Sequence, residues 1–347
     1  MNDWTRRGFL GAGTAAVAGA ALARVPGAPE RAQAAKGAAR AGEVKTGGIE
    51  LIPVMDGKYK VWTKKVGSGK IKLLTLHGGP GCTHEYFECF EDFLPKQGIE
   101  FYYYDQLGSA YSDQPDDTSL WTVDRFREEV EQVRQGLGLS NFYLLGHSWG
   151  GMLGIEYALK YQKNLKGLVI SDMTASIESY MVYANKLRSE LPKDVLAVLD
   201  QYEAKGQYDA PEYQKTMFEK VYTRHICRLD PWPDPLARTF KHLAAPVYNT
   251  MQGPNEFVIT GNFKDWNRWK DLSKIQVPTL VTGGRYDTMN PDDIRREGSL
   301  IPSSRVWICE NGSHLSMYDD QETYFKGLIG FLKDVEGGKF AARKSAA

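Results

Sequence analysis

The sequence lacks an excess of charge, paired cysteines and a long apolar segment, and each absence excludes a class of protein. Lysine and arginine together number 43, and aspartate and glutamate together also number 43. The chain therefore has no excess of positive charge that would indicate nucleic-acid binding. The four cysteines have no C-x-x-C spacing and no neighbouring histidine, which argues against a zinc site. We expect no metal and no cofactor. Such cysteines are mostly small, buried hydrophobic side chains, and a disulfide between two of them remains an alternative.

Residues 1–40 are predicted to be an export signal and linker, outside the fold. Thr5-Arg6-Arg7-Gly8-Phe9-Leu10 is a twin-arginine pattern, and a small-residue apolar run extends from Gly11 to Ala23. That run is too short and too rich in alanine to span a membrane. Ala32-Gln33-Ala34 offers a cleavage site. We expect twin-arginine export to a periplasm or the exterior, with no membrane attachment after signal removal; a disordered basic tail is the alternative.

Strand-like and helix-like segments then alternate. An opening antiparallel pair is expected around Asp56-Gly57, and the later alternation predicts an α/β fold with a mostly parallel sheet flanked by helices. The expected strands are Ile49–Val54, Tyr59–Val66, Ile71–Leu76, Ile99–Tyr104, Phe142–Leu145, Leu165–Ser171, Val277–Gly283 and Arg305–Cys309. Helices are expected over His84–Leu94, from Val123, over Met152–Tyr161 and over Gln321–Val335.

The alternation stops between residues 173 and 269. This part of the chain is helix-rich, aromatic and interrupted by prolines, which predicts a helical cap inserted into the sheet domain. The core would then comprise residues 41–172 and 270–337, and residues 338–347 would form a flexible tail. At 347 residues, one domain with an insertion suits the length better than two equal halves.

The chemistry is predicted to centre on Gly146-His147-Ser148-Trp149-Gly150. An apolar strand precedes this Gly-x-Ser-x-Gly motif and a helical segment follows it, which is the context of a nucleophile elbow. The serine must lie on a very tight turn, so the residues two positions away have to be small. The helix that follows directs the positive end of its dipole at the serine, where an oxyanion would develop.

A serine hydroxyl needs a base, and the base needs an orienting acid. With this elbow the chain order is Ser, then Asp or Glu, then His. His314 directly follows the last expected strand, whereas His225 and His242 fall in the cap. Asp287 follows the preceding strand, while Asp292 and Asp293 are weaker candidates because Pro291 suggests that they open a helix. Ser148, Asp287 and His314 are therefore the predicted triad.

An oxyanion hole requires backbone N–H donors that converge on one point. Trp149, next after the nucleophile, supplies one N–H group. The other is expected from Gly79 in the loop His77-Gly78-Gly79-Pro80-Gly81, since Pro80 has no N–H to donate.

Taken together, these motifs resemble the proline iminopeptidases and their amino-acid amidase relatives, within the α/β-hydrolase fold. The resemblance covers about residues 45–335. It rests on the glycine loop, Asp105-Gln106-x-Gly, the elbow, Gln252-Gly253-Pro254-Asn255-Glu256-Phe257, Gly284-Arg285-Tyr286-Asp287 and Gly312-Ser313-His314. It implies a serine hydrolase that cleaves an amide next to a free amine, proline favoured. The implied substrate is a small peptide or amino-acid amide; the oligomeric state stays open.

The resemblance also implies that Glu256 binds the substrate ammonium. A carboxylate in a partly dry pocket would favour a charged amine and disfavour blocked substrates. Some relatives carry a second glutamate directly after the triad aspartate, where this chain has Thr288. The loss of one anionic partner should weaken ammonium binding, so strictness for proline stays open.

Other functions remain as alternatives. The same triad would serve an amino-acid amide hydrolase or a carboxylesterase. A non-catalytic binding protein of this fold would normally lack a triad member, and all three are present. Haloalkane or epoxide hydrolysis would need an aspartate in place of Ser148.

Overall fold

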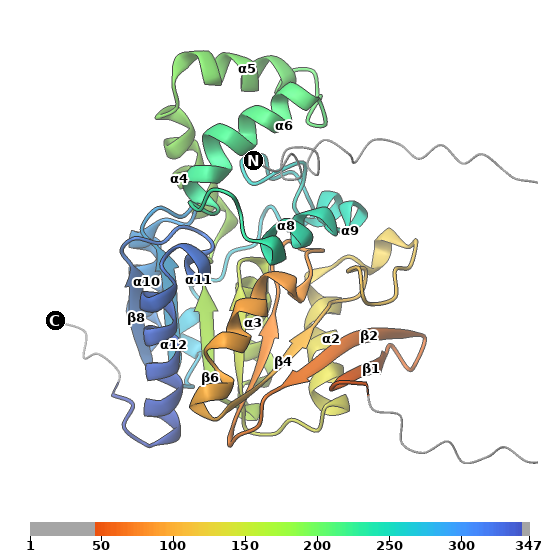
Figure 1. Cartoon of the computed structure of the whole chain (residues 1–347), viewed down its shortest axis with the longest axis vertical. Coiled ribbons are helices and arrows are strands. Elements are labelled where there is room, and N and C mark those ends of the chain that lie inside the picture. The colour runs from red at the N-terminus through yellow and green to blue at the C-terminus, as the bar shows by residue number, and fades with distance from the viewer. Residues whose placement is uncertain (1–45, 342–347) are drawn as a thin grey trace, which may run out of the picture.

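The computed structural model describes residues 46–341 and is built on one eight-stranded sheet (Figure 1). The strand order is β1-β2-β4-β3-β5-β6-β7-β8. The pairs β1–β2 and β2–β4 are antiparallel, and all other neighbours are parallel. The strands are β1 (Ile49–Val54), β2 (Tyr59–Val66), β3 (Ile71–Leu76), β4 (Ile99–Tyr104), β5 (Phe142–His147), β6 (Leu165–Ser171), β7 (Thr279–Gly284) and β8 (Ser304–Cys309).

The strands could be recognised in the sequence because most of them are buried and therefore apolar. β4, β5 and β7 are buried at every position, as expected for central strands of a sheet covered on both faces. The edge strand β1 instead exposes most of its residues. The predicted strands coincide with these within two residues at either end, and the mostly parallel α/β fold is confirmed.

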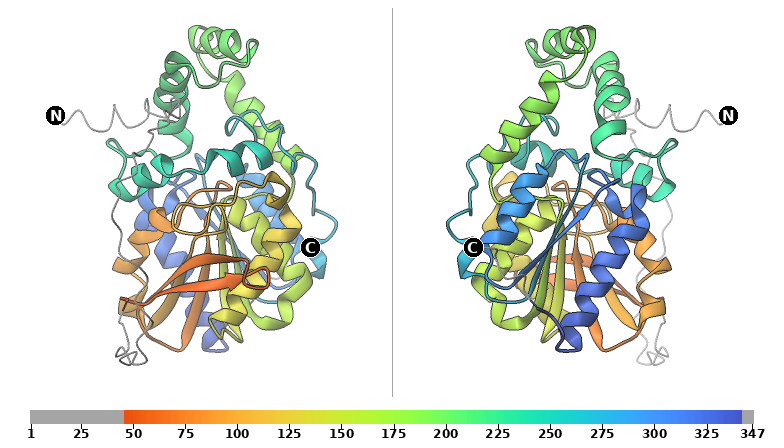
Figure 2. Two further views of the ribbon diagram at one scale, coloured as in Figure 1. Left: turned by 90° about the vertical axis from the view of Figure 1, so that its right-hand side faces the viewer. Right: turned by 90° about the vertical axis from the view of Figure 1, so that its left-hand side faces the viewer.

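Helices cover both faces of the sheet. Figure 2 shows α12 (Gln321–Glu336) on one face with η1 (His84–Asp92), while α2 (Val123–Gly136), α3 (Trp149–Tyr161) and α10 (Pro291–Leu300) lie on the other. The α3 helix packs on β3, β5 and β6. Because α3 begins directly after Ser148, its N-terminus lies at the carboxyl edge of the sheet.

Helices α4 to α9 are inserted between β6 and β7 and stand over the carboxyl edge of the sheet (Figure 1). They occupy the segment predicted as a cap. They are α4 (Ile177–Ser189), α5 (Lys193–Glu203), α6 (Pro211–Met217), α7 (Thr223–His225), α8 (Asp234–Lys241) and α9 (Ala245–Met251).

Helix α8 packs on η1 through a buried acid. Glu85 is fully buried and accepts hydrogen bonds from Arg238 at 2.6 Å and from His242 at 2.8 Å. Several hydrogen-bond donors can offset the desolvation of one buried carboxylate. The contact fixes this part of the cap over the sheet, and it places His242 away from the triad.

Segment His84–Asp92 is a 3-10 helix and not the expected amphipathic α-helix. A residue spacing of three aligns Phe87 and Phe90, both fully buried. All four cysteines are free. Within residues 46–341, no helix is long and apolar enough to cross a bilayer. The predicted export signal, like residues 342–347 of the predicted tail, lies outside the described residues.

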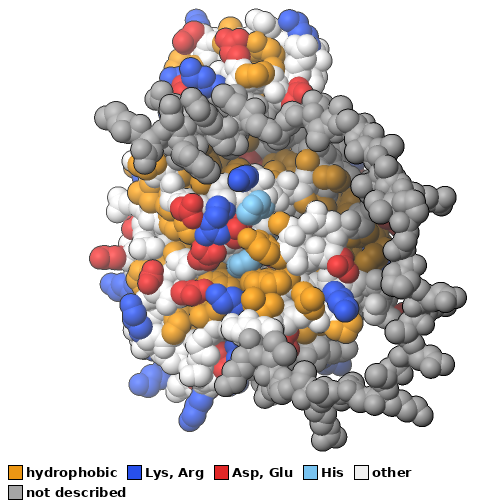
Figure 3. Space-filling view, turned by 45° about the vertical axis from the view of Figure 1, so that its right-hand side comes forward, with side chains coloured by type: hydrophobic (Ala, Val, Ile, Leu, Met, Phe, Trp, Pro, Cys, Tyr) orange, Lys and Arg blue, Asp and Glu red, His pale blue; other side chains and the backbone are white. Residues whose placement is uncertain are grey.

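Acidic, basic and hydrophobic side chains are interspersed on the face that Figure 3 shows. This mixture agrees with the equal numbers of acidic and basic residues in the sequence. An anionic polymer would require a field of one sign.

Candidate active site

Ser148 lies on a strained turn between β5 and α3. Its φ of 56° and ψ of −128° fall outside the regions that L-residues favour. A Cβ atom at Gly146 would lie 1.9 Å from the carbonyl oxygen of Gly150, and one at Gly150 would lie 2.1 Å from that of Leu76. Both positions therefore have to be glycine, as the sequence predicted, because backbone atoms occupy the space that a side chain would need.

The glycine loop after β3 passes directly against the serine. A Cβ atom at Gly78 would lie 2.9 Å from Cβ of Ser148, and Gly79 has a φ of 109° that favours glycine. The N–H group of Gly78 donates to the Tyr86 hydroxyl at 2.7 Å. That hydroxyl in turn lies 3.1 Å from Nδ1 of His147, so the loop is tied to the residue that precedes the nucleophile.

Gln106 connects the glycine loop to Trp149. Its amide Nε2 donates to the backbone oxygen of His77 at 3.0 Å, and its Oε1 accepts from the Trp149 indole at 2.8 Å. The backbone N–H of Trp149 opens α3 and is therefore among the helix donors without an intrahelical partner. The two predicted oxyanion donors, at Gly79 and Trp149, belong to segments that this amide holds together.

Asp287 and His314 follow adjacent strands, β7 and β8, and meet in a buried hydrogen bond. Nδ1 of His314 donates to Oδ1 of Asp287 at 2.7 Å, and the two residues are 5% and 0% exposed. Burial by itself lowers the pKa of His314, but the charge of the adjacent Asp287 and the hydrogen bond to it outweigh this effect, so the pKa of His314 lies above its ordinary value. The hydrogen bond leaves Nε2 of the imidazole to accept a proton.

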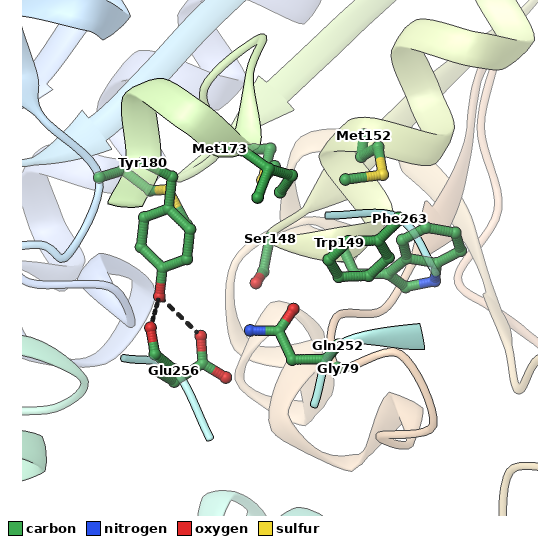
Figure 4. Close-up of a pocket in the computed structure, with 11 residues that line it drawn as sticks. Gly79, Ser148, Trp149, Met152, Met173, Tyr180, Gln252, Glu256 and Phe263 are labelled. Carbon is green, nitrogen blue, oxygen red and sulfur yellow. Dashed lines mark hydrogen bonds between the residues drawn. The ribbon is translucent and has the colours of Figure 1, made fainter. Parts of the chain in front are cut away.

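Glu256 enters the site from the cap, as Figure 4 shows. Its Oε1 accepts a hydrogen bond from Tyr248 at 2.6 Å. The Tyr180 hydroxyl lies 2.5 Å from the backbone oxygen of Glu256 and 3.1 Å from its Oε2, so its one proton is shared between these two acceptors. Burial, followed by the charge of Glu256, raises the pKa of both tyrosines well above its ordinary value. Both tyrosines are therefore hydrogen-bond donors at neutral pH.

A pocket joins Glu256 to Ser148 (Figure 4). Its walls are mainly thioether, aliphatic and aromatic side chains, and within the described chain Glu256 is the only acidic residue among them. The lining residues are Gly79, Ser148, Trp149, Met152, Met173, Ile177, Tyr180, Gln252, Glu256, Phe263 and Met289. One end of the pocket therefore offers a carboxylate to an ammonium, and the other walls are largely apolar.

The remaining candidates occupy other positions. Thr288 is buried, and its hydroxyl lies 3.2 Å from Oδ1 of Asp287. His225 belongs to the cap, where its backbone oxygen accepts from the N–H of His314 at 3.0 Å. Asp292 and Asp293 lie in the first turn of α10, where the sequence indicated a helix start.

Sequence reasoning missed the hydrogen-bonding residues behind the site. Gln106 was noted only as part of a motif, and Tyr180, Tyr248 and Tyr86 were not singled out. Tyrosines at these positions carry no local signal, because each acts on a segment that is distant in the chain. Only the Asp-Gln motif could have directed attention to Gln106.

An elbow serine, a strand-end Asp–His pair and a cap inserted before β7 define a hydrolase of the α/β type. In agreement, a family profile described as alpha/beta hydrolase fold matches residues 72–321. Solved structures under 20% identical, including an esterase from Exiguobacterium antarcticum at a TM-score of 0.58, share this fold.

More similar proteins narrow the assignment. The chain is 49% identical over 297 residues to a proline iminopeptidase of Elizabethkingia meningoseptica, covering 84% of this chain and 100% of that protein. It is 48% identical to one from Flavobacterium johnsoniae, covering 83% of this chain and 99% of that protein. The solved proline iminopeptidase of Mycobacterium smegmatis is 30% identical with a TM-score of 0.77, covering 84% and 99% of the two chains. The chain belongs to the proline iminopeptidase family.

Proposed function

We propose that this protein is a serine hydrolase that removes an N-terminal residue with a free amine, proline favoured, from small peptides. The observation that carries the proposal is the single carboxylate, Glu256, that faces the elbow serine across a small apolar pocket. Relatives that share nearly half of the sequence are named proline iminopeptidase, which supports the same assignment.

The reaction uses the triad in two steps. Ser148 Oγ attacks the substrate carbonyl carbon while His314 Nε2 takes the hydroxyl proton, and N–H groups of Gly79 and Trp149 stabilise the oxyanion. The C–N bond then breaks, and His314 returns its proton to the leaving amine. A water molecule, activated by His314 in the same way, hydrolyses the acyl-enzyme. Asp287 holds the imidazole in the required tautomer throughout.

Glu256 provides the selectivity for a free amine. A prolyl nitrogen is a charged secondary ammonium with two N–H donors, and a half-buried carboxylate such as Glu256 binds this group far better than it binds a neutral amide. Tyr180 and Tyr248 fix the carboxylate at the end of the pocket, so the distance from the ammonium to the scissile carbonyl is set before binding. An N-blocked substrate would leave Glu256 without its partner.

The test compares kcat/KM for a prolyl anilide and its N-acetyl derivative in the wild type and in Glu256→Gln. We expect acetylation to lower the wild-type value by about a hundredfold or more, and the variant to lose most of this discrimination. Glu219→Gln, at an exposed cap glutamate, is the matched control and should behave as wild type. Equal rates on both substrates in the wild type would instead favour a general amide or ester hydrolase.

We also propose export by the twin-arginine route, which rests on the Arg6-Arg7 pattern and the apolar run that follows it. Replacement of both arginines by lysine should retain the protein in the cytoplasm. Fractionation of cells that express the full chain measures this, and unchanged export of the variant would contradict the proposal.

A further inference from the structure

A second buried carboxyl group lies beside the triad and takes no part in the reaction described above. Asp172 directly follows β6, and Asp287 follows β7, which pairs with β6 through Ser171 and Thr282. Both aspartates are 0% exposed. Their carboxyl groups are within hydrogen-bonding reach of each other. Adjacent parallel strands thus deliver two acids to one point at the carboxyl edge of the sheet.

The backbone holds Asp172 in this place at a conformational cost. Its φ is 54°, in the left-handed region that few non-glycine residues adopt. Its N–H donates to the Thr282 oxygen at 2.8 Å, and its Oδ1 accepts from the N–H of Gly284 at 3.0 Å. Its Oδ2 lies 2.6 Å from the Ser171 hydroxyl. The side chain is therefore fixed between the ends of β6 and β7.

Asp287 has one oxygen that needs a donor. Its Oδ1 accepts from His314 and from the Thr288 hydroxyl. Its Oδ2 is buried and, among residues 46–341, has no hydrogen-bond partner. A bare oxygen on a buried carboxylate is costly. A neighbouring carboxylic acid can supply the missing donor, whereas a second carboxylate cannot.

The surroundings of Asp172 favour the acid form. The titratable groups around it are Asp287, His314, His147, Tyr86, Cys309 and Tyr324. Of these only His314, when protonated, brings a cation, and its effect on the pKa of Asp172 is smaller than that of burial and of Asp287. Burial and the nearby Asp287 charge raise the pKa of Asp172 well above its ordinary range. His147 does not supply a charge, because burial and the neighbouring His314 lower its pKa well below the ordinary value.

We propose that Asp172 is a positioning residue of the triad, whose carboxylic acid donates a hydrogen bond to Oδ2 of Asp287. The proposal rests on the proposed function only in taking Asp287 as the orienting acid. The donated hydrogen bond fixes the plane of the Asp287 carboxylate and so the direction of the His314 imidazole. It also leaves a single negative charge beside that ring. A second charge would stabilise the imidazolium and hinder its action as a base.

The test uses Asp172→Asn and Asp172→Ala, with Glu297→Gln as a matched control that alters a buried acid on α10, outside the triad. Two quantities are measured for each purified variant. One is kcat/KM for a prolyl anilide as a function of pH. The other is the rate at which a fluorophosphonate modifies Ser148, which reports serine activation without any substrate amine.

We expect Asp172→Ala to lower both rates by about ten- to a hundredfold, the range for loss of a hydrogen bond to a buried charge. Asp172→Asn retains an N–H donor and should stay within about threefold of wild type. The acid limb of the kcat/KM profile should have the same pKa in Asp172→Asn as in the wild type, because Asp172 is already neutral in the wild type. A fall of that limb by one pH unit or more would show that Asp172 is ionised and would overturn the proposal.

Two further outcomes would also overturn it: Asp172→Asn as slow as Asp172→Ala, or Asp172→Ala as fast as wild type. If Asp172→Ala fails to fold, the rate and pH profile of Asp172→Asn still decide. A wild type that reacts with the fluorophosphonate but does not cleave the prolyl anilide would refute the proposed substrate, and the role of Asp172 would then be read from the phosphonylation rates alone.

Discussion

Two glycines on helix α3 should respond in opposite ways to the same substitution. A Cβ atom at Gly150 would lie 2.1 Å from the oxygen and 2.7 Å from the carbon of the Leu76 carbonyl, whereas one at Gly154 meets only Leu168 Cδ1 at 3.4 Å. Backbone cannot move aside as a flexible side chain can. Gly150→Ala should therefore incur about 3 kcal/mol of overpacking, offset by about 1 kcal/mol of helix propensity.

The net destabilisation of about 2 kcal/mol lowers Tm by roughly 3 °C. The displaced turn should also shift Ser148, and a misplacement of about 1 Å can reduce kcat roughly a hundredfold. Gly154→Ala keeps the propensity gain of up to about 1 kcal/mol and normal activity. Thermal unfolding and prolyl-anilide kinetics measure both. If Gly150→Ala is as stable and active as Gly154→Ala, the steric account of the elbow is wrong.

Other expectations concern the triad and one buried acid outside it. Ser148→Ala should abolish turnover of every substrate without changing Tm. If the purified variant were as active as the wild type, the mechanism would be wrong. The adjacent acid raises the pKa of His314, and only the neutral imidazole is a base. The decline of kcat/KM towards low pH should therefore have a pKa above the ordinary histidine value of about 6.5. A pKa at or below that value contradicts this assignment. Glu297 is buried, and neither carboxylate oxygen has a partner among the described residues. Burial raises the pKa of Glu297 in the folded state, so the folded protein holds this proton more tightly than the unfolded chain does. The contribution of Glu297 to the free energy of unfolding is therefore fully present below the unfolded-state pKa of about 4.3. It is lost as the pH rises towards the folded-state pKa. Glu297→Gln should raise the free energy of unfolding at pH 8 and not at pH 4, and an equal change at both values would refute this.

Much of the site could be read from the sequence because its parts are local. The elbow needs small residues at fixed offsets from Ser148, and it lies between a strand and a helix that are each recognisable alone. Asp287 and His314 directly follow the last two strands. Since parallel strands end at one edge of a sheet, their order in the chain predicted that these residues would meet. The cap was predicted as the segment where the alternation stops.

One feature of the fold differs in detail from the prediction. The expected α-helix at His84–Leu94 is a 3-10 helix ending at Asp92, because pattern spacing alone does not separate three from 3.6 residues per turn over so short a segment.

The sequence by itself determined the fold class, the predicted triad and the two segments predicted to hold the oxyanion, since each depends on neighbours along the chain. Tertiary structure alone decided that Tyr180 and Tyr248 hold Glu256, and that Gln106 joins the glycine loop to Trp149. It also decided that Asp172 lies against Asp287. These contacts depend on how the cap is seated and on which strands become neighbours, and both are set by packing between segments far apart in the chain.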